Sequence, residues 1–367
     1  MSRTMPKSYW IVFALLTLIL FGCATEGRKS IPPELENRIV FLCSEGICTI
    51  NPDGTESRVI VPSDSGGPFS NAQWSPDKRR IGFTGYVDGQ ARVMLVESDG
   101  SNRRIFPSPK EETPDRRTRG TRRVALAPYQ VNFSAWSPEG RRLSAGLFAG
   151  LDNTGTVVIM DTKGKELFRT ILGAYARFCR EDEIVFATST SPFSSPENDI
   201  ISLNLANGTK KNLTTGRKHT YFPPVVSPDG KRVAYTFDPL RGPGELWIME
   251  VDGSNKRRLA GGDRDFLGRY LPIVSFSPDG SKILFVAAKL REETAALYTV
   301  DVDGANLTKI TDEIVKSRGG ASWSPDGTRI VFTSNKDGND ELYIVNADGS
   351  GLRRLTSNTT RDCCPDW

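Results

Sequence analysis

This chain of 367 residues lacks the common catalytic motifs that depend on histidine or on a glycine-rich phosphate loop. The chain has one histidine, His219, so a metal site built on two or three histidines cannot form. A Ser-His-Asp triad would have to use His219, and the sequence has no Gly-x-Ser-x-Gly turn to present a serine nucleophile. Phosphate-binding Gly-x-Gly-x-x-Gly and P-loop motifs are also absent from the sequence. We therefore interpret His219, in "GRKHTYFPP", as a loop residue with a local hydrogen bond.

Carboxylates are the remaining source of catalysis, because a glycosidase needs only two of them at a suitable separation. Most aspartates fall in repeated turns, where a structural role explains them: Asp229, Asp252, Asp279, Asp303, Asp326 and Asp348. The stretch "SNKDGNDEL" has oxygen-bearing side chains spaced as in calcium loops, at Asn335, Asp337, Asn339, Asp340 and Glu341. It lacks the twelfth-position glutamate and also fits a hairpin with a glycine turn. We expect no cofactor, with Ca²⁺ at this stretch as the alternative.

The cysteines are typical of a protein from an oxidising compartment. Five of them follow Cys23, so they cannot all pair with one another. In "LCSEGICTI", a two-residue turn at Glu45-Gly46 would place Cys43 opposite Cys48 in a non-hydrogen-bonded pair, within disulfide reach. We predict this bridge. The pairing of the adjacent Cys363 and Cys364 stays open, and Cys179 is expected to be a buried thiol.

Residues 1–22 have the pattern of an export signal. Arg3 and Lys7 precede "WIVFALLTLILF", an apolar stretch of signal-peptide length that is short for a membrane span. It leads into "LFGCATEG", which resembles the lipobox of bacterial lipoproteins, so Cys23 is the expected lipidation site and residues 23–37 a polar tether. The alternative is a plain secretory signal. The resemblance implies a lipid anchor on the periplasmic side of the outer membrane in a diderm bacterium, or otherwise on the outer side of the cell membrane.

The net positive charge of the chain is concentrated in one segment. The formal net charge is +4, and residues 1–22 supply two positive side chains of it. The small remainder predicts no polyanionic partner, so we do not expect nucleic-acid binding. From Arg103 to Arg123, however, eight basic residues stand against three acidic ones. We interpret this basic insert as a binding candidate for an acidic partner or lipid phosphates, and the alternative is a solvated loop; its central residues are Arg116, Arg117, Arg119, Arg122 and Arg123.

A repeated unit must position all of these residues. "QWSPDKRRIGF", "AWSPEGRRLSA", "VSPDGKRVAYT", "FSPDGSKILFV" and "SWSPDGTRIVF" each join an inner strand to an apolar second strand through a Ser-Pro-Asp-Gly type of reversal. A third strand, a second Asp-Gly turn and a short basic fourth strand follow. The middle strands are nearly continuous apolar runs, so neighbouring units must cover both of their faces. The pattern predicts an all-β propeller with four-stranded blades.

The residues that end the inner strands give the number of blades: Trp74, Trp136, Phe178, Val226, Phe276, Trp323 and Trp367. They predict seven blades, or six if the degenerate unit at 178–213 merges with a neighbour. The repeats begin with "RIVFLC", a second strand without an inner strand, and end with "CCPDW", an inner strand without its blade. We therefore predict that the C-terminal strand closes the ring of a propeller over residues 38–367.

These units resemble the WD-like Pro-Asp repeat of the TolB family of periplasmic propellers. TolB has six blades and a globular domain before them, whereas we expect seven blades and a tether, so the resemblance is to a TolB-like lipoprotein. It implies a non-catalytic, membrane-anchored scaffold of the bacterial envelope whose partner is an envelope protein, such as a Pal-like lipoprotein, or cell-wall glycan. The alternative is a propeller that binds or cleaves carbohydrate with acidic residues at the mouth of its channel.

Overall fold

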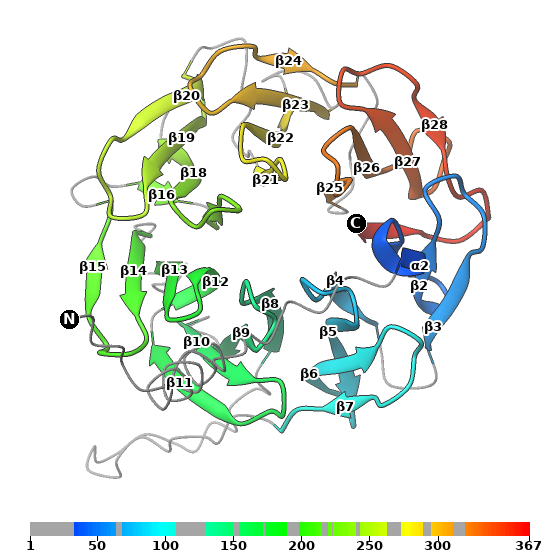
Figure 1. Ribbon diagram of the computed structural model, residues 1–367, viewed down its shortest axis with the longest axis horizontal. Coiled ribbons are helices and arrows are strands. Elements are labelled where there is room, and N and C mark those ends of the chain that lie inside the picture. Colours follow the sequence, from blue (N-terminus) through cyan, green and yellow to red (C-terminus); the bar gives the residue numbers. More distant parts are fainter. Residues whose placement is uncertain are drawn as a thin grey trace, which may run out of the picture.

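The seven blades predicted from the repeat are present in the structure, a computed structural model. It describes residues 33–63, 68–107, 130–149, 154–171, 173–188, 198–214, 219–221, 223–239, 243–262, 273–288, 295–311 and 320–367. These residues form seven antiparallel sheets arranged in a ring around one axis (Figure 1). The seven-bladed propeller is confirmed, and the six-bladed alternative is wrong.

Each blade begins with an inner strand at the axis and ends with an outer strand at the rim. In that order, blade 1 has β29 (Cys363–Asp366), β1 (Ile39–Cys43), β2 (Gly46–Ile50) and β3 (Arg58–Pro62); blade 2 has β4 (Ser70–Trp74), β5 (Arg80–Val87), β6 (Gln90–Glu97) and β7 (Arg104–Ile105). Blade 3 has β8 (Gln130–Trp136), β9 (Arg142–Ala149), β10 (Thr154–Asp161) and β11 (Glu166–Ile171); blade 4 has β12 (Gly173–Arg180), β13 (Glu183–Thr188), β14 (Ile200–Asn204) and β15 (Lys210–Asn212).

Blade 5 differs in having two short inner strands. It has β16 (His219–Tyr221) and β17 (Val225–Val226), then β18 (Arg232–Pro239), β19 (Glu245–Glu250) and β20 (Arg257–Gly261). Blade 6 has β21 (Ile273–Phe276), β22 (Lys282–Ala288), β23 (Ala295–Asp301) and β24 (Thr308–Lys309), and blade 7 has β25 (Ala321–Trp323), β26 (Arg329–Ser334), β27 (Glu341–Asn346) and β28 (Arg353–Arg354). The loop predicted for His219 is wrong, because its backbone pairs with Pro239 of β18.

The Ser-Pro-Asp-Gly reversals are held by hydrogen bonds within the turn. In blade 6 the Ser277 hydroxyl donates to the Asp279 carboxylate at 2.6 Å, and the backbone N–H of Ser281 donates to the same oxygen at 3.0 Å. Gly280 takes a φ of +70°, which favours glycine. The Ser277 hydroxyl holds the pKa of Asp279 below its ordinary value. The turn aspartates therefore have the structural role that the repeat predicts.

The core consists of apolar layers between neighbouring blades. The layer between blades 7 and 1, for example, joins Phe41 and Ile50 to Val331 and Leu342. The last layer depends on β29, which pairs with β1 through Leu42 with Cys363 and Val40 with Asp366, and on the buried Trp367 that follows β29. The prediction that the C-terminal strand closes the ring is confirmed.

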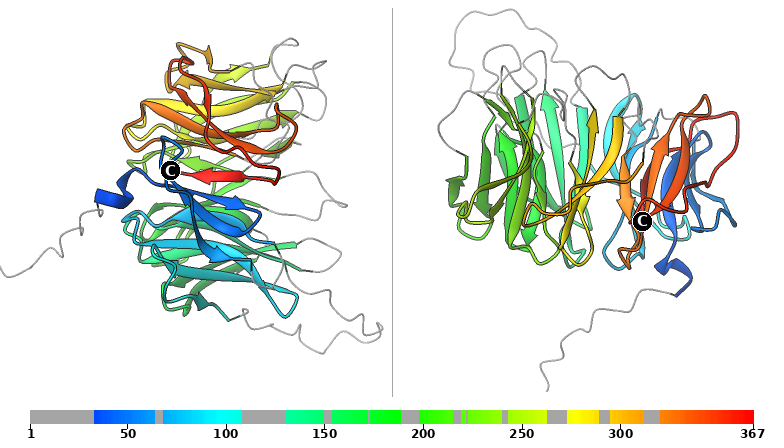
Figure 2. Two further views of the ribbon diagram at one scale, coloured as in Figure 1. Left: turned by 90° about the vertical axis from the view of Figure 1, so that its right-hand side faces the viewer. Right: turned by 90° about the horizontal axis from the view of Figure 1, so that it is seen from above.

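The ring has two faces with different connections (Figure 2). The turns from first to second strand and from third to fourth strand lie on one face, which we call the turn face, and α2 (Pro33–Glu36) enters β1 on that side. The second strands end, and the first strands begin, at the opposite loop face. In the described part of the chain no helix is long and apolar enough to cross a membrane.

The last residues of the predicted tether are helical. Pro33 begins α2, where its missing N–H costs nothing, and Glu34 and Glu36 lie in this first turn. Leu35 packs against the layer between blades 1 and 2. Residues 23–32 of the tether, which include Cys23, lie outside the described residues.

Cys43 and Cys48 are joined by a disulfide with a Cα–Cα distance of 5.9 Å. The predicted turn, however, is wrong: Cys43 pairs with Gly46, so the turn residues are Ser44 and Glu45. Gly46 is required by β3 instead, because a Cβ on it would lie 1.9 Å from the carbonyl oxygen of Val61. The two cysteines are therefore diagonal neighbours on one face of the hairpin.

Candidate functional site

We call the seven residues at or near the ends of the inner strands the landmarks: Trp74, Trp136, Phe178, Val226, Phe276, Trp323 and Trp367. The residue directly before each landmark lies at the axis of the ring. We call these residues the axial ring: Gln73, Ala135, Arg177, Val225, Ser275, Ser322 and Asp366. Strand side chains alternate in direction, so these residues point away from the layers that contain the landmarks; Val225 packs against the layer between blades 5 and 6. Inner strands expose an unpaired backbone edge, which polar side chains can satisfy.

Four members of the axial ring bond to the backbone of a neighbouring inner strand: Asp366, Ser322 and Gln73 to the next one, and Arg177 to the preceding one. Asp366 accepts a hydrogen bond from the N–H of Trp74 at 2.8 Å, and the Ser322 hydroxyl oxygen accepts one from the N–H of Trp367 at 3.1 Å. Gln73 and Arg177 both donate to the carbonyl oxygen of Ser134, at 3.4 and 2.7 Å. The polar residues at the axis thus tie blades 1 to 4 and 7 together.

The axial ring contains one carboxyl group, on Asp366, and one guanidinium group, on Arg177. Burial lowers the pKa of the Arg177 guanidinium to about 10. Burial also raises the pKa of Asp366 to about 6, although the N–H of Trp74 and the Lys78 ammonium oppose it. Among the described residues of the seven inner strands, Asp366 is the single carboxylate. A glycosidase needs two carboxyl groups roughly 5 to 9.5 Å apart, and the described inner strands supply one.

Replacing Asp366 with Asn is expected to stabilise the propeller at neutral pH. Between about pH 4 and pH 6 the folded chain keeps a proton that the unfolded carboxyl has lost, so stability falls as the pH rises through this window. The amide oxygen of Asn still accepts from Trp74 and carries no charge. We expect a gain at pH 7 of at most about 3 kcal/mol, measured by urea unfolding between pH 4 and pH 7.

Asp229→Asn is the matched control for this prediction. Its carboxylate accepts from the Ser227 hydroxyl, which keeps the pKa of Asp229 below its ordinary value. The sign is therefore reversed, and D229N should be less stable than the native chain at pH 7. A D366N variant whose stability follows pH as the native chain does would contradict the role assigned to Asp366.

A left-handed residue recurs three positions before the landmark in four inner strands. These residues are Asn71 (φ 54°), Tyr175 (φ 57°), Gly320 (φ 70°) and Cys364 (φ 62°). Asn71, Tyr175 and Cys364 lie near a register shift of their inner strand, Gly320 directly precedes β25, and Asn and Gly adopt this conformation readily. Tyr175 is 45% exposed, and its ring centroid lies 6.1 Å from that of Phe148. It lies nearer the loop face than Arg177 and gives the axis an exposed aromatic group there.

The predicted calcium stretch is a hydrogen-bonded cluster of side chains. Glu341 is 0% exposed and accepts from Thr356, from the N–H of Asn358 at 3.0 Å and from Arg354 at 2.9 Å. Asn339 donates to Glu341 at 2.9 Å. In the described residues no group of three His, Cys, Asp or Glu is placed to hold a metal ion. The oxygens that calcium would use therefore already have protein donors.

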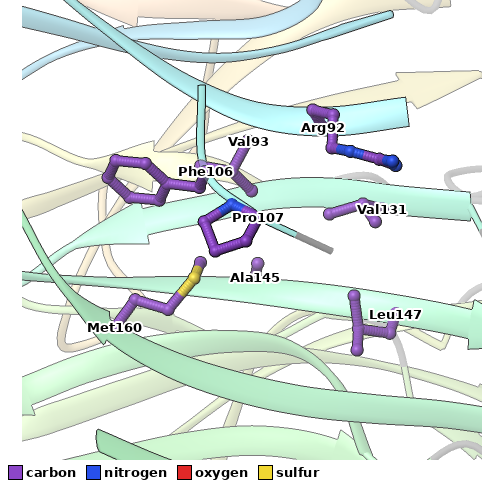
Figure 3. Close-up of a pocket in the computed structure, with 8 residues that line it drawn as sticks. All are labelled: Arg92, Val93, Phe106, Pro107, Val131, Ala145, Leu147 and Met160. Atoms are coloured by element: carbon purple, nitrogen blue, oxygen red, sulfur yellow. The ribbon is translucent and has the colours of Figure 1, made fainter. Parts of the chain in front are cut away.

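A small cavity lies between blades 2 and 3, at the base of the basic insert. The view in Figure 3 shows Arg92, Val93, Phe106, Pro107, Val131, Ala145, Leu147 and Met160 around it. Its volume is about 10 Å³, enough for roughly one water molecule and too small for an organic ligand. The five arginines of the insert lie outside the described residues, and β7 and β8 flank them.

Lys78 holds the N-terminal segment on the turn face. It takes the glycine position of its turn with a φ of 52°, and its ammonium donates to the carbonyl oxygens of Glu36 at 2.9 Å and Arg38 at 3.2 Å. Its Nζ lies 5.7 Å from the centroid of the Trp74 ring. Burial lowers the pKa of Lys78 to about 8. Lysine therefore replaces glycine at this turn because its side chain ties the entering chain to blade 2.

The Lys78→Gly substitution should release that segment without unfolding the ring. Glycine relieves the left-handed backbone, while the loss of two charge-assisted hydrogen bonds removes the attachment. We expect amide exchange at residues 33–38 to become at least about ten-fold faster, measured by hydrogen exchange and mass spectrometry. Lys231→Gly, at an exposed position of the blade 5 turn, is the control and should change nothing there. Equal protection of residues 33–38 in all three chains would refute the attachment.

Comparisons with known proteins agree with the repeat. Residues 272–367 match the family model described as "TolB beta propeller domain". The Tol-Pal system protein TolB of Anaeromyxobacter dehalogenans strain 2CP-C is 30% identical over 133 residues, which is 35% of this chain and 27% of that protein. An uncharacterized protein of Agrobacterium fabrum is 27% identical over 142 residues, 38% of this chain and 45% of that protein. The chain thus spans less than half the length of these relatives.

Solved structures share the fold at low sequence identity. TolB from Acinetobacter baumannii superposes with a TM-score of 0.56 and 17% identity, covering 97% of this chain and 71% of that one. Oligogalacturonate lyase in complex with manganese gives 0.59 and 13% identity, over 88% and 85% of the two chains. The propeller domain of the Trilobed protease from Pyrococcus furiosus gives 0.58 and 14%, over 85% and 90%. In its repeats, its ring of seven blades and the match of residues 272–367 to that family model, this chain is similar to the TolB-like β-propellers.

Proposed function

We propose that this protein is a non-catalytic, membrane-anchored scaffold of the bacterial cell envelope that binds a partner protein through its loop face. The observation that carries the proposal is that the N-terminal segment and the strands flanking the basic insert lie on opposite faces of the ring. The chain enters at the turn face through α2, whereas β7 ends and β8 begins, on either side of the basic insert, at the loop face. A lipid on Cys23 would leave the loop face directed away from the membrane.

The chemistry of the axis supports binding rather than catalysis. Asp366 has no second carboxylate beside it on the described inner strands, and the polar axial residues are engaged with neighbouring backbones. A rigid ring with variable loops tolerates changes in those loops without loss of the core, which suits a display surface. The relatives named as Tol-Pal system proteins support an envelope partner, and we propose a Pal-like lipoprotein.

Cross-linking in intact cells, followed by mass spectrometry, tests this function. The native chain should give one dominant cross-linked protein, and a variant with Gln at the five arginines of the basic insert should lose it. The control makes the same change of charge at five exposed turn-face residues: Arg141, Lys163, Lys165, Lys231 and Lys256. It should keep the partner. Loss of the partner in both variants, or no specific partner in the native chain, would reject the loop-face scaffold.

The lipid anchor is tested separately, with the Cys23→Ser variant. The native chain should fractionate with membranes and carry a mass increase on residue 23, and C23S should lose that modification. An unmodified native N-terminus beyond residue 22 would instead indicate the plain secretory signal. The experiment does not depend on the partner.

Carbohydrate binding is the second candidate, and the exposed Tyr175 favours it, because aromatic rings stack on sugar faces. Titration with soluble cell-wall fragments tests it against the variant Tyr175→Ala. Binding by the native chain that Y175A loses would support a glycan ligand at the axis. Binding that survives in Y175A would place the ligand elsewhere.

A further inference from the structure

Two adjacent cysteines of the closing strand lie side by side. The Sγ atoms of Cys363 and Cys364 are 2.8 Å apart; Cys363 is 4% exposed and Cys364 is half-buried. Neighbouring residues of an extended strand point to opposite faces, so this contact requires a departure from the strand. The φ of 62° at Cys364 supplies it.

The fold, and not the cysteines, produces this conformation. Asn71, Tyr175 and Gly320 have the same left-handed φ at the equivalent place in blades 2, 4 and 7. The N–H of Cys364 donates to the Thr333 hydroxyl of blade 7 at 3.1 Å, and Cys363 pairs with Leu42 of blade 1. The two thiols are therefore held together by the closure of the ring.

We propose that Cys363 and Cys364 form a redox-active dithiol that is converted to a disulfide by exchange with a small-molecule or protein disulfide. The Cys364 thiolate attacks one sulfur of the incoming disulfide, forms a mixed disulfide and releases the first thiol. The Cys363 sulfur then attacks Sγ of Cys364, which forms the Cys363–Cys364 bond and releases the second thiol. The dithiol loses two electrons and two protons, and the incoming disulfide becomes two thiols.

The surroundings assign the two roles. Cys364 is the more exposed residue of the two, and the Cys363 thiol beside it lowers the pKa of Cys364, with Arg361 adding to this effect and burial and Asp340 opposing it. The thiolate is the nucleophile in exchange, so Cys364 attacks first. Cys179, in contrast, is buried, and burial raises the pKa of its thiol to about 12, which leaves it unreactive.

The bond should also open easily. Adjacent Cα atoms lie about 3.8 Å apart across a trans peptide, below the roughly 4.4 to 6.8 Å that disulfides prefer. A bridge between neighbours is therefore strained, and strained disulfides are reduced more readily. The Cys43–Cys48 bridge in the same blade, with its Cα–Cα distance of 5.9 Å, lies within the preferred range and serves as an internal reference.

Peptide mass spectrometry of the full chain tests the proposal. Trypsin cleavage after Arg361 gives residues 362–367, which hold both thiols. After incubation with glutathione disulfide, acid quenching and alkylation, this peptide should carry no alkyl group and be two hydrogens lighter than the dithiol. Mild dithiothreitol should restore two alkylation sites at a concentration that leaves Cys43–Cys48 oxidised.

Two variants make the result specific. Cys363→Ser should stop at the mixed disulfide, with one glutathione on Cys364, and Cys179→Ser should behave as the native chain does. In the reduced native chain, phenylarsine oxide should block both alkylation sites at one per chain, and C363S should lose this protection. Free thiols in excess glutathione disulfide, a lasting glutathione adduct on the native chain, or a bridge to another cysteine would each overturn the proposal.

Discussion

Removal of residues 363–367 is expected to abolish cooperative folding of the propeller. The deletion takes away β29, and with it the ladder to β1, the Asp366 contact to Trp74 and the buried Trp367. Loss of a buried tryptophan alone costs about 3 to 5 kcal/mol, and a typical domain has about 5 to 15 kcal/mol in total. Urea unfolding followed by tryptophan fluorescence and circular dichroism measures the effect.

Trp367→Phe is the control for this deletion. Nε1 of Trp367 is buried without a hydrogen-bond partner, so phenylalanine loses no hydrogen bond and keeps much of the apolar contact. The ring of Trp367 also lies 4.9 Å from the Arg329 guanidinium, an attraction that phenylalanine retains in weaker form. W367F should unfold cooperatively with a moderate loss of stability. A deletion variant that unfolds like W367F would show that the ring does not need β29.

The second large effect is expected at Glu341. The Glu341→Ala substitution should destabilise the chain by about 3 kcal/mol, at the lower end of the range for breaking a buried ion pair, because Arg354 is partly exposed. It leaves the Thr356 hydroxyl, the Asn358 N–H and the Arg354 guanidinium without their acceptor. Denaturant midpoints of the variant and the native chain give the difference. A change below about 0.5 kcal/mol would contradict the role assigned to this cluster.

The pH dependence separates the charge of Glu341 from its shape. Burial raises the pKa of Glu341, but the bonds from Thr356, Asn358, Asn339 and Arg354 outweigh it and leave that pKa below its ordinary value. Its contribution to stability is therefore present above about pH 4.5 and is lost as the pH falls through the folded pKa. Glu341→Gln keeps the shape but turns an NH₂ group toward donors, so we expect an intermediate loss without this acid dependence.

The repeat made the architecture predictable because each unit has the same kinds of turn and strand residues. Ser-Pro-Asp-Gly turns and continuous apolar strands specify a blade, and the unmatched strands at 38–43 and 363–367 specify how the ring closes. The cysteine bridge was predictable for a related reason, since two cysteines flanking a tight hairpin must lie close. Its register was not, because Gly46 reads as a turn glycine although the close approach of Val61 requires it.

The axis was much harder to predict from the sequence. Asn71 and Gly320 are types that favour a left-handed φ, so the interval of three residues before Trp74 and Trp323 could have indicated that conformation. Tyr175 and Cys364 give no such signal, because tertiary packing imposes their conformation. The acid-rich stretch near Glu341 suggested calcium as an alternative because its oxygens are spaced as in calcium loops. The same oxygens are equally suited to bind the Arg354 guanidinium and neighbouring amides.

The closing strand also has a consequence for biosynthesis. The backbone edge of β1 is synthesised more than 300 residues before its partner β29. Until residues 363–367 have been delivered, blade 1 offers an open strand edge and the apolar surface that Trp367 later covers. Chains interrupted before that point should therefore bind chaperones and be degraded.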